Sequence, residues 1–275
     1  MQDRKGPDLG YQVPGNLVPG TRAPSPISNL NRALSTPIMT IIIENISKSF
    51  STRQVLSKVT LTVNRGEIVT IMGENGCGKT TLFNIVAGLL EPDEGSVSIN
   101  GQNPREVFPS IVFQDYRESL FPWLTVRQNI EFAYTKSVKS GKRPPFETEG
   151  LIEALGIKDL ADRYPHELSG GEAQLVGIAR ALAFGSEVVL LDEPSSSLSF
   201  DMEQRFHEVL LKYREKMQAT VLLISHDPRE AVHISNKVVV LSKNPARVIR
   251  CLDIKPGYYN EFLNELIRLL RWRCQ

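Results

Sequence analysis

One glycine-rich segment combines residue types and a spacing that bind phosphate. It consists of Gly73, Glu74, Asn75, Gly76, Cys77, Gly78, Lys79, Thr80 and Thr81. Glycine lets the backbone turn tightly and approach an anion closely, and the N-terminus of a following helix attracts negative charge. Lys79 would add a point charge for the β- and γ-phosphates of a nucleotide, and the Thr80 hydroxyl could bind Mg²⁺. The segment therefore predicts binding of a nucleoside triphosphate.

The stretches on either side of this segment predict the elements that hold it. Residues 68–72 are apolar and indicate a buried strand, and the apolar spacing of residues 82–90 indicates a helix packed on a sheet. A strand, a glycine-rich turn and a helix in this order form a P-loop. A glycine-rich loop that binds no nucleotide is the alternative, and its position between a strand and a helix argues against it.

Polar residues follow three other apolar runs that predict strands. Asp192 and Glu193 follow residues 188–191. Near a P-loop, Asp192 could hold Mg²⁺, and Glu193 could polarise the water that attacks the γ-phosphate. Gln114 and His226 end the other two strands, at the edge where α/β sheets bind ligands, and Gln114 could reach a metal or the attacking water. A strand-end cap for Gln114 and a structural role for His226 are the alternatives.

Two more stretches could contact a nucleotide. Phe50 is expected in a polar loop, where its ring could stack on an adenine or be partly buried. A second anion site is expected at the start of the helical run 173–184, where a hydroxyl and backbone N–H groups would face the anion. Its residues are Ser169, Gly170, Gly171 and Glu172. An ordinary helix N-cap is the alternative for this site.

The composition is that of an ordinary globular protein and excludes several classes. Of the 275 residues, 41% are apolar and 23% are charged, and the net charge of +1 gives no reason to expect nucleic acid as a partner. No apolar run approaches the roughly 18–20 residues of a membrane-spanning helix. The three cysteines, Cys77, Cys251 and Cys274, predict neither a disulfide framework nor a zinc site. This cysteine usage fits a cytosolic location.

Shifts in composition divide the chain into parts. Residues 1–38 are rich in proline and glycine and predict a disordered arm, and translation from Met39 is an alternative start. The section from 116 to about 170 changes to helical patterns. Residues 258–272 predict an amphipathic helix, for which packing on the domain is favoured over a membrane-surface role.

Taken in chain order, these motifs closely resemble the nucleotide-binding subunit of ATP-binding-cassette (ABC) transporters over about residues 41–250. The resemblance rests on Phe50, the Walker A loop 73–80, the lid glutamine Gln114, the signature 168–172, the Walker B strand 188–192 with Glu193, and the switch histidine His226. Within the family, the chain is similar to importer subunits for nitrate, sulfonate, taurine, bicarbonate and related anions. The matching stretches are 119–126, 164–167 and 226–232.

The resemblance implies an α/β fold, with a P-loop NTPase (RecA-like) core, an N-terminal antiparallel β subdomain and an inserted α-helical subdomain. The ABC ATP-binding domain would span residues 39–250, with the helical subdomain at about 116–170 and a helical tail at 251–275. The expected activity is ATP hydrolysis coupled to transport, with ATP and Mg²⁺ as cofactors. The residues expected in catalysis are Lys79, Gln114, Glu193 and His226, and those expected to hold the metal are Thr80, Gln114 and Asp192.

The resemblance also implies partners. Two cassettes would form a head-to-tail dimer, identical or not, in which Ser169, Gly170 and Gly171 of one meet the nucleotide on the Walker A loop of the other. Integral-membrane permease subunits would bind the dimer at the cytoplasmic face of the membrane. An extracytoplasmic solute-binding protein would take part indirectly, and no nucleic acid is expected.

Two positions depart from the family pattern. Ser199 stands where the family usually has an Asp that helps to join the two sites, and Leu175 stands where Arg is common. Pairing with a different cassette is one interpretation of Ser199. The alternative functions are a soluble, non-transport ABC ATPase that acts on nucleic acid or ribosomes, and a weakly hydrolysing regulatory cassette.

Overall fold

The computed structural model describes residues 41–115 and 119–271. The chain divides into Met1–Pro37 and Ile38–Gln275, and all of the described residues belong to the second unit. The disordered arm expected at residues 1–38 lies outside the described residues.

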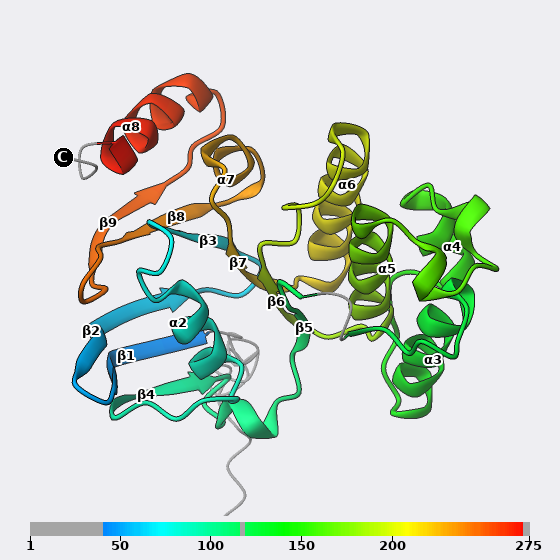
Figure 1. Ribbon diagram of the computed structural model, residues 1–275, viewed down its shortest axis with the longest axis horizontal. Helices are drawn as coiled ribbons and strands as arrows, with labels where there is room; N and C mark the ends of the chain where they lie inside the picture. Colours follow the sequence, from blue (N-terminus) through cyan, green and yellow to red (C-terminus); the bar gives the residue numbers. More distant parts are fainter. Residues whose placement is uncertain (1–40, 116–118, 272–275) are drawn as a thin grey trace, which may run out of the picture. The chain divides into compact units, whose positions relative to one another are not determined.

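The smaller of the two sheets is antiparallel and has three strands, in the order β2-β1-β4 (Figure 1). Its strands are β1 (Ile41–Phe50), β2 (Arg53–Val63) and β4 (Glu94–Ile99). Phe50 pairs with Arg53 across the turn between β1 and β2. The expectation that Phe50 lies in a loop is therefore wrong, because the hairpin pairing continues to the last residue of β1.

The larger sheet has six strands in the order β5-β6-β7-β3-β8-β9. In that order they are β5 (Ser110–Val112), β6 (Val188–Asp192), β7 (Thr220–Ile224), β3 (Ile68–Met72), β8 (Lys237–Leu241) and β9 (Val248–Asp253). Neighbouring strands are parallel except for β9, which is antiparallel to β8. The carboxyl ends of the five parallel strands therefore lie at one edge of the sheet, as the sequence predicts for its polar strand ends.

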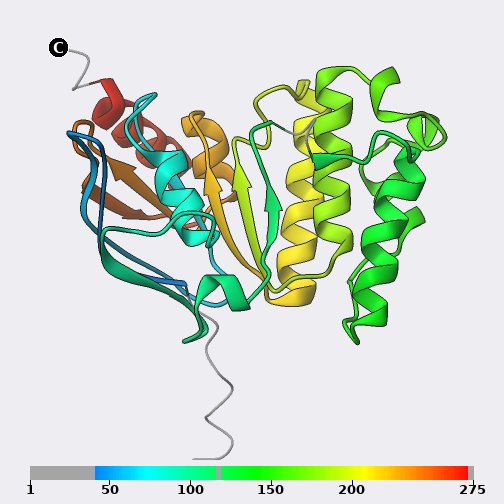
Figure 2. The ribbon, with the colours of Figure 1, turned by 60° about the horizontal axis from the view of Figure 1, so that its bottom comes forward.

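Both faces of the larger sheet are covered, which explains why its central strands are apolar without alternation. Helix α2 (Lys79–Val86) and the small sheet pack on the face that contains Val69 and Ile71. Helices α5 (Gly170–Ala183) and α6 (Phe200–Met217) pack on the opposite face. In Figure 2, α5 and α6, in yellow-green and yellow, lie on one side of the strands, and α2 and the blue strands lie on the other.

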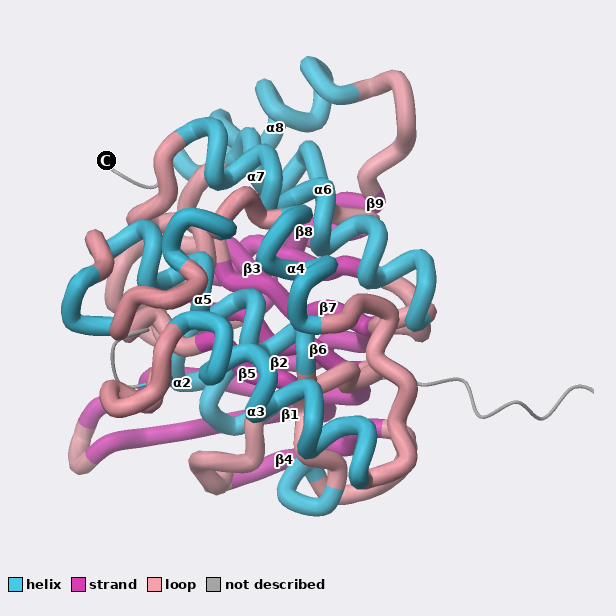
Figure 3. Tube along the Cα trace, turned by 90° about the vertical axis from the view of Figure 1, so that its right-hand side faces the viewer, coloured by secondary structure: helices cyan, strands magenta, loops and turns pink. Residues whose placement is uncertain are grey.

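A layer of helices extends from α5 through the section expected to be helical, and Figure 3 shows these helices in front of the strands. Its members are α3 (Val126–Lys139) and α4 (Thr148–Ala154), which share a buried core with α5. Thr125 caps α3 by accepting a hydrogen bond from a backbone N–H of the first turn. The fully buried Asn129 accepts a hydrogen bond from Phe121 N at 2.9 Å and so ties the preceding loop to α3.

Two helices pack against the part of the larger sheet that contains β8 and β9. They are α7 (Pro228–Ile234) and α8 (Tyr259–Arg271), which pack with β8 and β9. Leu266 of α8 is fully buried in this cluster, so the tail packs on the domain as predicted. The boundary expected at residue 250 is wrong, because antiparallel pairing with β8 continues β9 to Asp253.

Candidate nucleotide-binding site

The loop of residues 73–78 leaves the central strand β3 and enters α2. Because β3 pairs in parallel with β7 and β8, the loop lies at the carboxyl edge of the sheet. Gly78 has a φ of 115°, and a Cβ there would lie 2.9 Å from Val55 Cγ1. Both the left-handed backbone and the close approach of β2 therefore favour glycine. This turn aims the N-terminus of α2, which starts at Lys79, at the loop.

Lys79 lies across the loop that precedes it. Its ammonium group donates hydrogen bonds to the carbonyl oxygens of Gly73, at 2.9 Å, and Glu74, at 3.2 Å. The residue is only 6% exposed, so its charge is held within the loop. The Glu74 carboxylate forms an ion pair with Lys243 at 3.1 Å, outside this group. The loop therefore presents a positive charge where a phosphate would enter.

Asp192 ends β6 and is 2% exposed. Burial and the neighbouring Glu193 carboxylate raise its pKa from 3.8 to about 6, while a hydrogen bond from Thr80 and the charge of Lys79 act in the opposite direction. Its Oδ1 atom is buried and has no hydrogen-bond partner among the described residues. An unpartnered carboxylate oxygen beside a threonine hydroxyl is a hard-oxygen donor set that fits Mg²⁺.

The Glu193 side chain contacts two side chains that follow the neighbouring strands. Its Oε2 atom lies 3.3 Å from Gln114 Nε2 and 3.5 Å from His226 Nδ1. Gln114, Glu193 and His226 follow β5, β6 and β7, which are neighbours in the sheet. Glu193 has a φ of 49°, an uncommon conformation for a residue with a side chain, and its N–H donates to Ile224 O at 3.0 Å.

A cavity of about 440 Å³ lies over the loop and α2. It is lined by Phe50, Arg53, Val55, Asn75, Gly76, Gly78, Lys79, Thr80, Thr81, Gln114 and Glu193. Phe50 is 47% exposed at this cavity. Arg53, which donates a hydrogen bond to Asn244 Oδ1 at 2.9 Å, is a site residue that the sequence reasoning missed. Arg53 lies close to Phe50 only because the two residues pair in the β1–β2 hairpin, and Arg53 belongs to no sequence motif.

Other residues of the glycine-rich segment have supporting positions. Gly73, Glu74 and Cys77 do not line the cavity. Cys77 is 2% exposed in the apolar cluster beneath the loop, and burial raises the pKa of its thiol. A Cβ on Gly73 would lie 2.9 Å from Cys77 Sγ. These residues therefore shape the loop through packing and backbone contacts.

The signature residues form the N-terminus of α5, away from the cavity of their own chain. Ser169 caps the helix, because its hydroxyl accepts a hydrogen bond from Glu172 N at 3.4 Å. The Glu172 carboxylate in turn accepts one from Ser169 N at 2.7 Å, which completes a capping box. A Cβ on Gly171 would lie 2.5 Å from Ser197 O, so the segment after Glu193 closely approaches this helix.

Gln174 connects the signature helix to the segment that carries Glu193. Its side chain is fully buried and donates a hydrogen bond to Glu193 O at 3.0 Å. The same amide accepts a hydrogen bond from Ser197 N at 3.0 Å. Sequence reasoning missed this link, because both of these partners are backbone groups.

The two departures from the family pattern occupy different environments. Ser199 is the N-cap of α6 and forms no side-chain capping hydrogen bond. Leu175 is fully buried in the core between the sheet and the helices. The leucine is thus accounted for by packing, whereas Ser199 leaves a helix N-terminus without the bond that an N-cap side chain can make.

Comparison with known proteins identifies the family. The model of the family described as "ABC transporter" matches residues 56–196. The chain belongs to the ABC transporter family. This cassette is 39% identical over 208 residues to the nitrate import ATP-binding protein NrtD of Synechocystis sp., an alignment that covers 74% of this chain and 76% of the relative. The resemblance found in the sequence is confirmed.

Further relatives are import ATP-binding proteins as well. The aliphatic sulfonates import ATP-binding protein SsuB of Bacillus cereus is 38% identical over 228 residues, which cover 80% of this chain and 88% of the relative. The nitrate import ATP-binding protein NrtC of Synechococcus elongatus is 36% identical over 233 residues, and this alignment covers 78% of the chain and only 35% of NrtC. These relatives support an ATPase subunit of an importer over an ATPase that acts on nucleic acid or ribosomes.

Solved structures confirm the expected fold class. A dimeric bacterial ABC transporter cassette matches with a TM-score of 0.65 at 28% identity, over 78% of this chain and 99% of that chain. A dimeric post-hydrolysis cassette bound to ADP and phosphate matches with a TM-score of 0.66 at 28% identity, over the same shares of the two chains. Within residues 41–115 and 119–271, no helix is both long and apolar enough to cross a membrane.

Proposed function

We propose that this cassette binds and hydrolyses ATP to energise the uptake of a small anion through a separate permease. The observation that carries the proposal is the placement of Glu193 beside the P-loop, with Gln114 and His226 at the same carboxylate oxygen. This arrangement suits attack of a water on a γ-phosphate. Among the relatives, the nitrate and aliphatic sulfonates import proteins and a bicarbonate transport protein support nitrate, a sulfonate such as taurine, or bicarbonate as the solute.

ATP would bind in the cavity of about 440 Å³. The triphosphate would lie against the backbone N–H groups at the start of α2, and Lys79 would exchange its bonds to two loop carbonyls for bonds to phosphate oxygens. The adenine would stack on the exposed ring of Phe50. Arg53 would add a positive charge to the wall that leads to this ring.

Glu193 would act as the general base for the attacking water. Its side chain is 15% exposed, so its charge is only weakly screened by bulk solvent. Gln114 and His226 would orient this carboxylate and the water through their contacts with Oε2. The backbone bonds of Glu193 to Ile224 and Gln174 would keep the side chain aimed at the phosphate.

Asp192, Thr80 and Gln114 would hold Mg²⁺, in agreement with the unpartnered Oδ1 atom of Asp192. When bound, the ion would supply positive charge to the β- and γ-phosphates.

A second cassette would complete each site. Ser169, Gly170 and Gly171 do not line the cavity of their own chain, and Ser169 is exposed. Their hydroxyl and backbone N–H groups at the start of α5 would meet the γ-phosphate held by the partner. The dimeric cassettes among the solved structures support this arrangement.

An aromatic surface would receive the permease. The Phe121 ring lies 5.4 Å from the Trp123 ring and 5.1 Å from the Phe132 ring. Trp123 is 69% exposed and Phe132 is 44% exposed, which is unusual for large aromatics unless a partner covers them. Docking here would place the cassette peripherally on the cytoplasmic face of the membrane, and an extracytoplasmic solute-binding protein would act only through the permease.

Tagging the protein and extracting membranes with detergent tests the transport role. A polytopic membrane protein in stoichiometric amount is the expected co-purifying partner. Recovery only in the soluble fraction, together with ribosomes or DNA, would contradict it. The uncapped Ser199 favours one second candidate, a weakly hydrolysing regulatory cassette. Phosphate release by the purified complex separates the two, because a regulatory cassette would release phosphate only weakly.

A further inference from the structure

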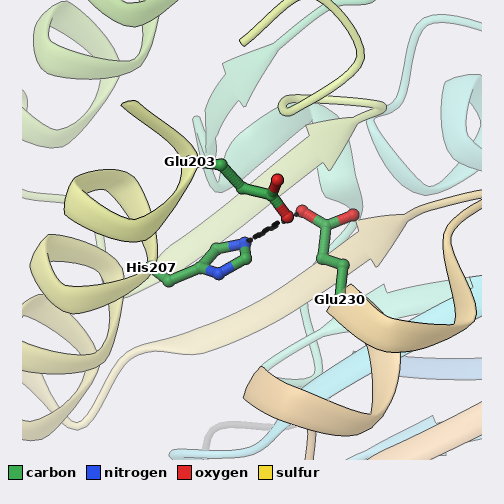
Figure 4. A group of neighbouring side chains, drawn as sticks. All are labelled: Glu203, His207 and Glu230. Atoms are coloured by element: carbon green, nitrogen blue, oxygen red, sulfur yellow. Dashed lines mark hydrogen bonds and ion pairs between the residues drawn. The ribbon is translucent and has the colours of Figure 1, made fainter. Parts of the chain in front are cut away.

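A buried group of two glutamates and one histidine joins α6 to α7, outside the nucleotide cavity. Glu203 and His207 are one helical turn apart on α6, and Glu230 lies on α7. His207 Nε2 lies 3.3 Å from Glu230 Oε1 and 3.7 Å from Glu203 Oε1. Figure 4 shows the three side chains converging from the two helices. One ligand atom from each residue lies within 4.8 Å of the others, which is close enough to share one metal ion.

The group is shielded from water and carries an excess of negative charge. His207 and Glu230 are each 2% exposed, and the Glu203 side chain is 24% exposed. Two carboxylates that share one imidazole at low solvent exposure are costly unless a positive charge lies between them.

Arg229 lines the cavity beside the group, but within the described residues it does not pair with either carboxylate. Among the described residues, no lysine or arginine forms an ion pair with Glu203 or Glu230. The second oxygen of Glu230 accepts a short hydrogen bond from the Ser225 hydroxyl, which leaves Oε1 for His207. The Nδ1 atom of His207 has no hydrogen-bond partner within the described part of the chain, and the ring contacts the two glutamates through Nε2.

A small cavity of about 230 Å³ opens beside the three side chains. The titratable residues that line it are Glu203, His207, Asp227, Arg229, Glu230, His233 and Tyr259. The rings of His207 and His233 are 5.7 Å apart. The group therefore has room on one side for a water or a further ligand beside a metal ion.

We propose that Glu203, His207 and Glu230 bind a divalent transition metal of the zinc class. One imidazole nitrogen and two carboxylate oxygens suit Zn²⁺ or Co²⁺, whereas Mg²⁺ favours oxygen donors alone. The ion supplies the positive charge that the two carboxylates require and crosslinks α6 to α7. Because α7 begins shortly after His226, the crosslink stabilises the segment that carries this catalytic side chain. The site is independent of the nucleotide cavity, whose lining includes none of these three residues.

Cobalt titration of the full-length, untagged, nucleotide-free protein after chelator treatment tests the proposal. We expect one equivalent of Co²⁺ per chain, with a visible absorption band that Zn²⁺ abolishes. His207→Asn and Glu203→Gln should each weaken Co²⁺ binding at least about tenfold, since even outer-shell substitutions at metal sites cost 10–100-fold. The matched controls His166→Asn and Glu208→Gln change exposed residues and should bind as the wild type does.

Asp192→Asn removes a proposed Mg²⁺ ligand of the nucleotide-binding site. This variant should keep the cobalt absorption band, because Asp192 is not a ligand of the proposed zinc-class site. If His207→Asn fails to fold, as its circular dichroism would show, Glu203→Gln carries the test because its side chain is partly exposed. Zn²⁺ should also raise the Tm of the wild type and leave that of Glu203→Gln unchanged. The absence of saturable binding by the wild type, or equal binding by the wild type and both ligand variants, would overturn the proposal.

Discussion

The Gln174 side chain donates a hydrogen bond to the backbone carbonyl of Glu193 at 3.0 Å. Gln174 belongs to the helix that starts with the signature residues, and Glu193 is the proposed general base of the same chain. Together with the bond from Ser197 N to Gln174 Oε1, this contact connects the surface that would face a second cassette with the backbone that aims the catalytic carboxylate. In the proposed dimer, closure on ATP would act on Glu193 through this buried amide.

Replacement of this amide tests its positioning role. Gln174→Leu keeps a similar volume but removes the buried partner of Ser197 N and one of the two donors to Glu193 O, which should lower the free energy of unfolding by roughly 1–3 kcal/mol. We expect kcat for ATP to fall about tenfold or more, with the Kd for ATP nearly unchanged, because the nucleotide cavity does not include Gln174. Gln102→Leu, at an exposed position, is the control. A loss of stability without a change in kcat would leave Gln174 a purely structural role.

The ring of Phe50 should contribute to nucleotide affinity. Phe50→Ala removes an exposed aromatic face at the cavity and should raise the Kd for ATP about two- to tenfold, which corresponds to an aromatic contact of ~0.5–1.5 kcal/mol. Phe50→Tyr should retain the affinity of the wild type. Phe108→Ala is the matched control, because Phe108 is 73% exposed and does not line the cavity. Equal affinities of Phe50→Ala and the wild type would exclude stacking on this ring.

Asp192 should make the stability of the metal-free, nucleotide-free protein depend on pH. Its pKa rises from 3.8 to about 6 on folding, so the folded protein binds this proton more tightly than the unfolded chain. The resulting stabilisation is complete below the unfolded pKa and is lost as the pH rises through about 6. Asp192→Asn is neutral at every pH, so its Tm relative to the wild type should increase between about pH 4 and pH 6. Asp253→Asn is the exposed control, and a Tm difference that is constant with pH would contradict the raised pKa.

Ser199 offers a test of the departure from the family pattern. Ser199→Asp places a negative charge and a capping oxygen at the N-terminus of α6, which should stabilise the fold by ~0.5–1 kcal/mol. We also expect higher basal phosphate release, because the resemblance gives an Asp at this position a role in joining two sites. Ser199→Asn separates the two effects, since it can cap the helix without the charge. An unchanged or lower rate for Ser199→Asp would show that the serine is no defect.

Much of the site could be predicted because its residues follow strand ends. Gln114, Glu193 and His226 end apolar runs, and parallel pairing brings such ends to one edge of a sheet. The end of β1 is harder to delimit, since Ser47, Lys48 and Ser49 are polar, and only pairing with β2 extends the strand to Phe50. The end of β9 was missed for the same reason, because pairing with β8 decides it.

Contacts between elements that are distant in the sequence could not be predicted. Gln174 bonds to Glu193 O and Ser197 N, backbone groups whose position depends on how α5 packs on the sheet. The closeness of His207 to Glu230 depends on the packing of α6 against α7, which no spacing in the sequence predicts. Tertiary packing, rather than local pattern, creates both groups.

The central claim is that Glu193 activates water for ATP hydrolysis at a site formed by the P-loop. The most direct test compares ATP binding and phosphate release for the wild type, Glu193→Gln and Lys79→Ala. Lys79→Ala should abolish ATP binding, because it removes the charge held within the loop. Glu193→Gln should bind ATP as the wild type does and release phosphate about 10²–10⁴-fold more slowly. Phosphate release by Glu193→Gln at nearly the wild-type rate would contradict the account.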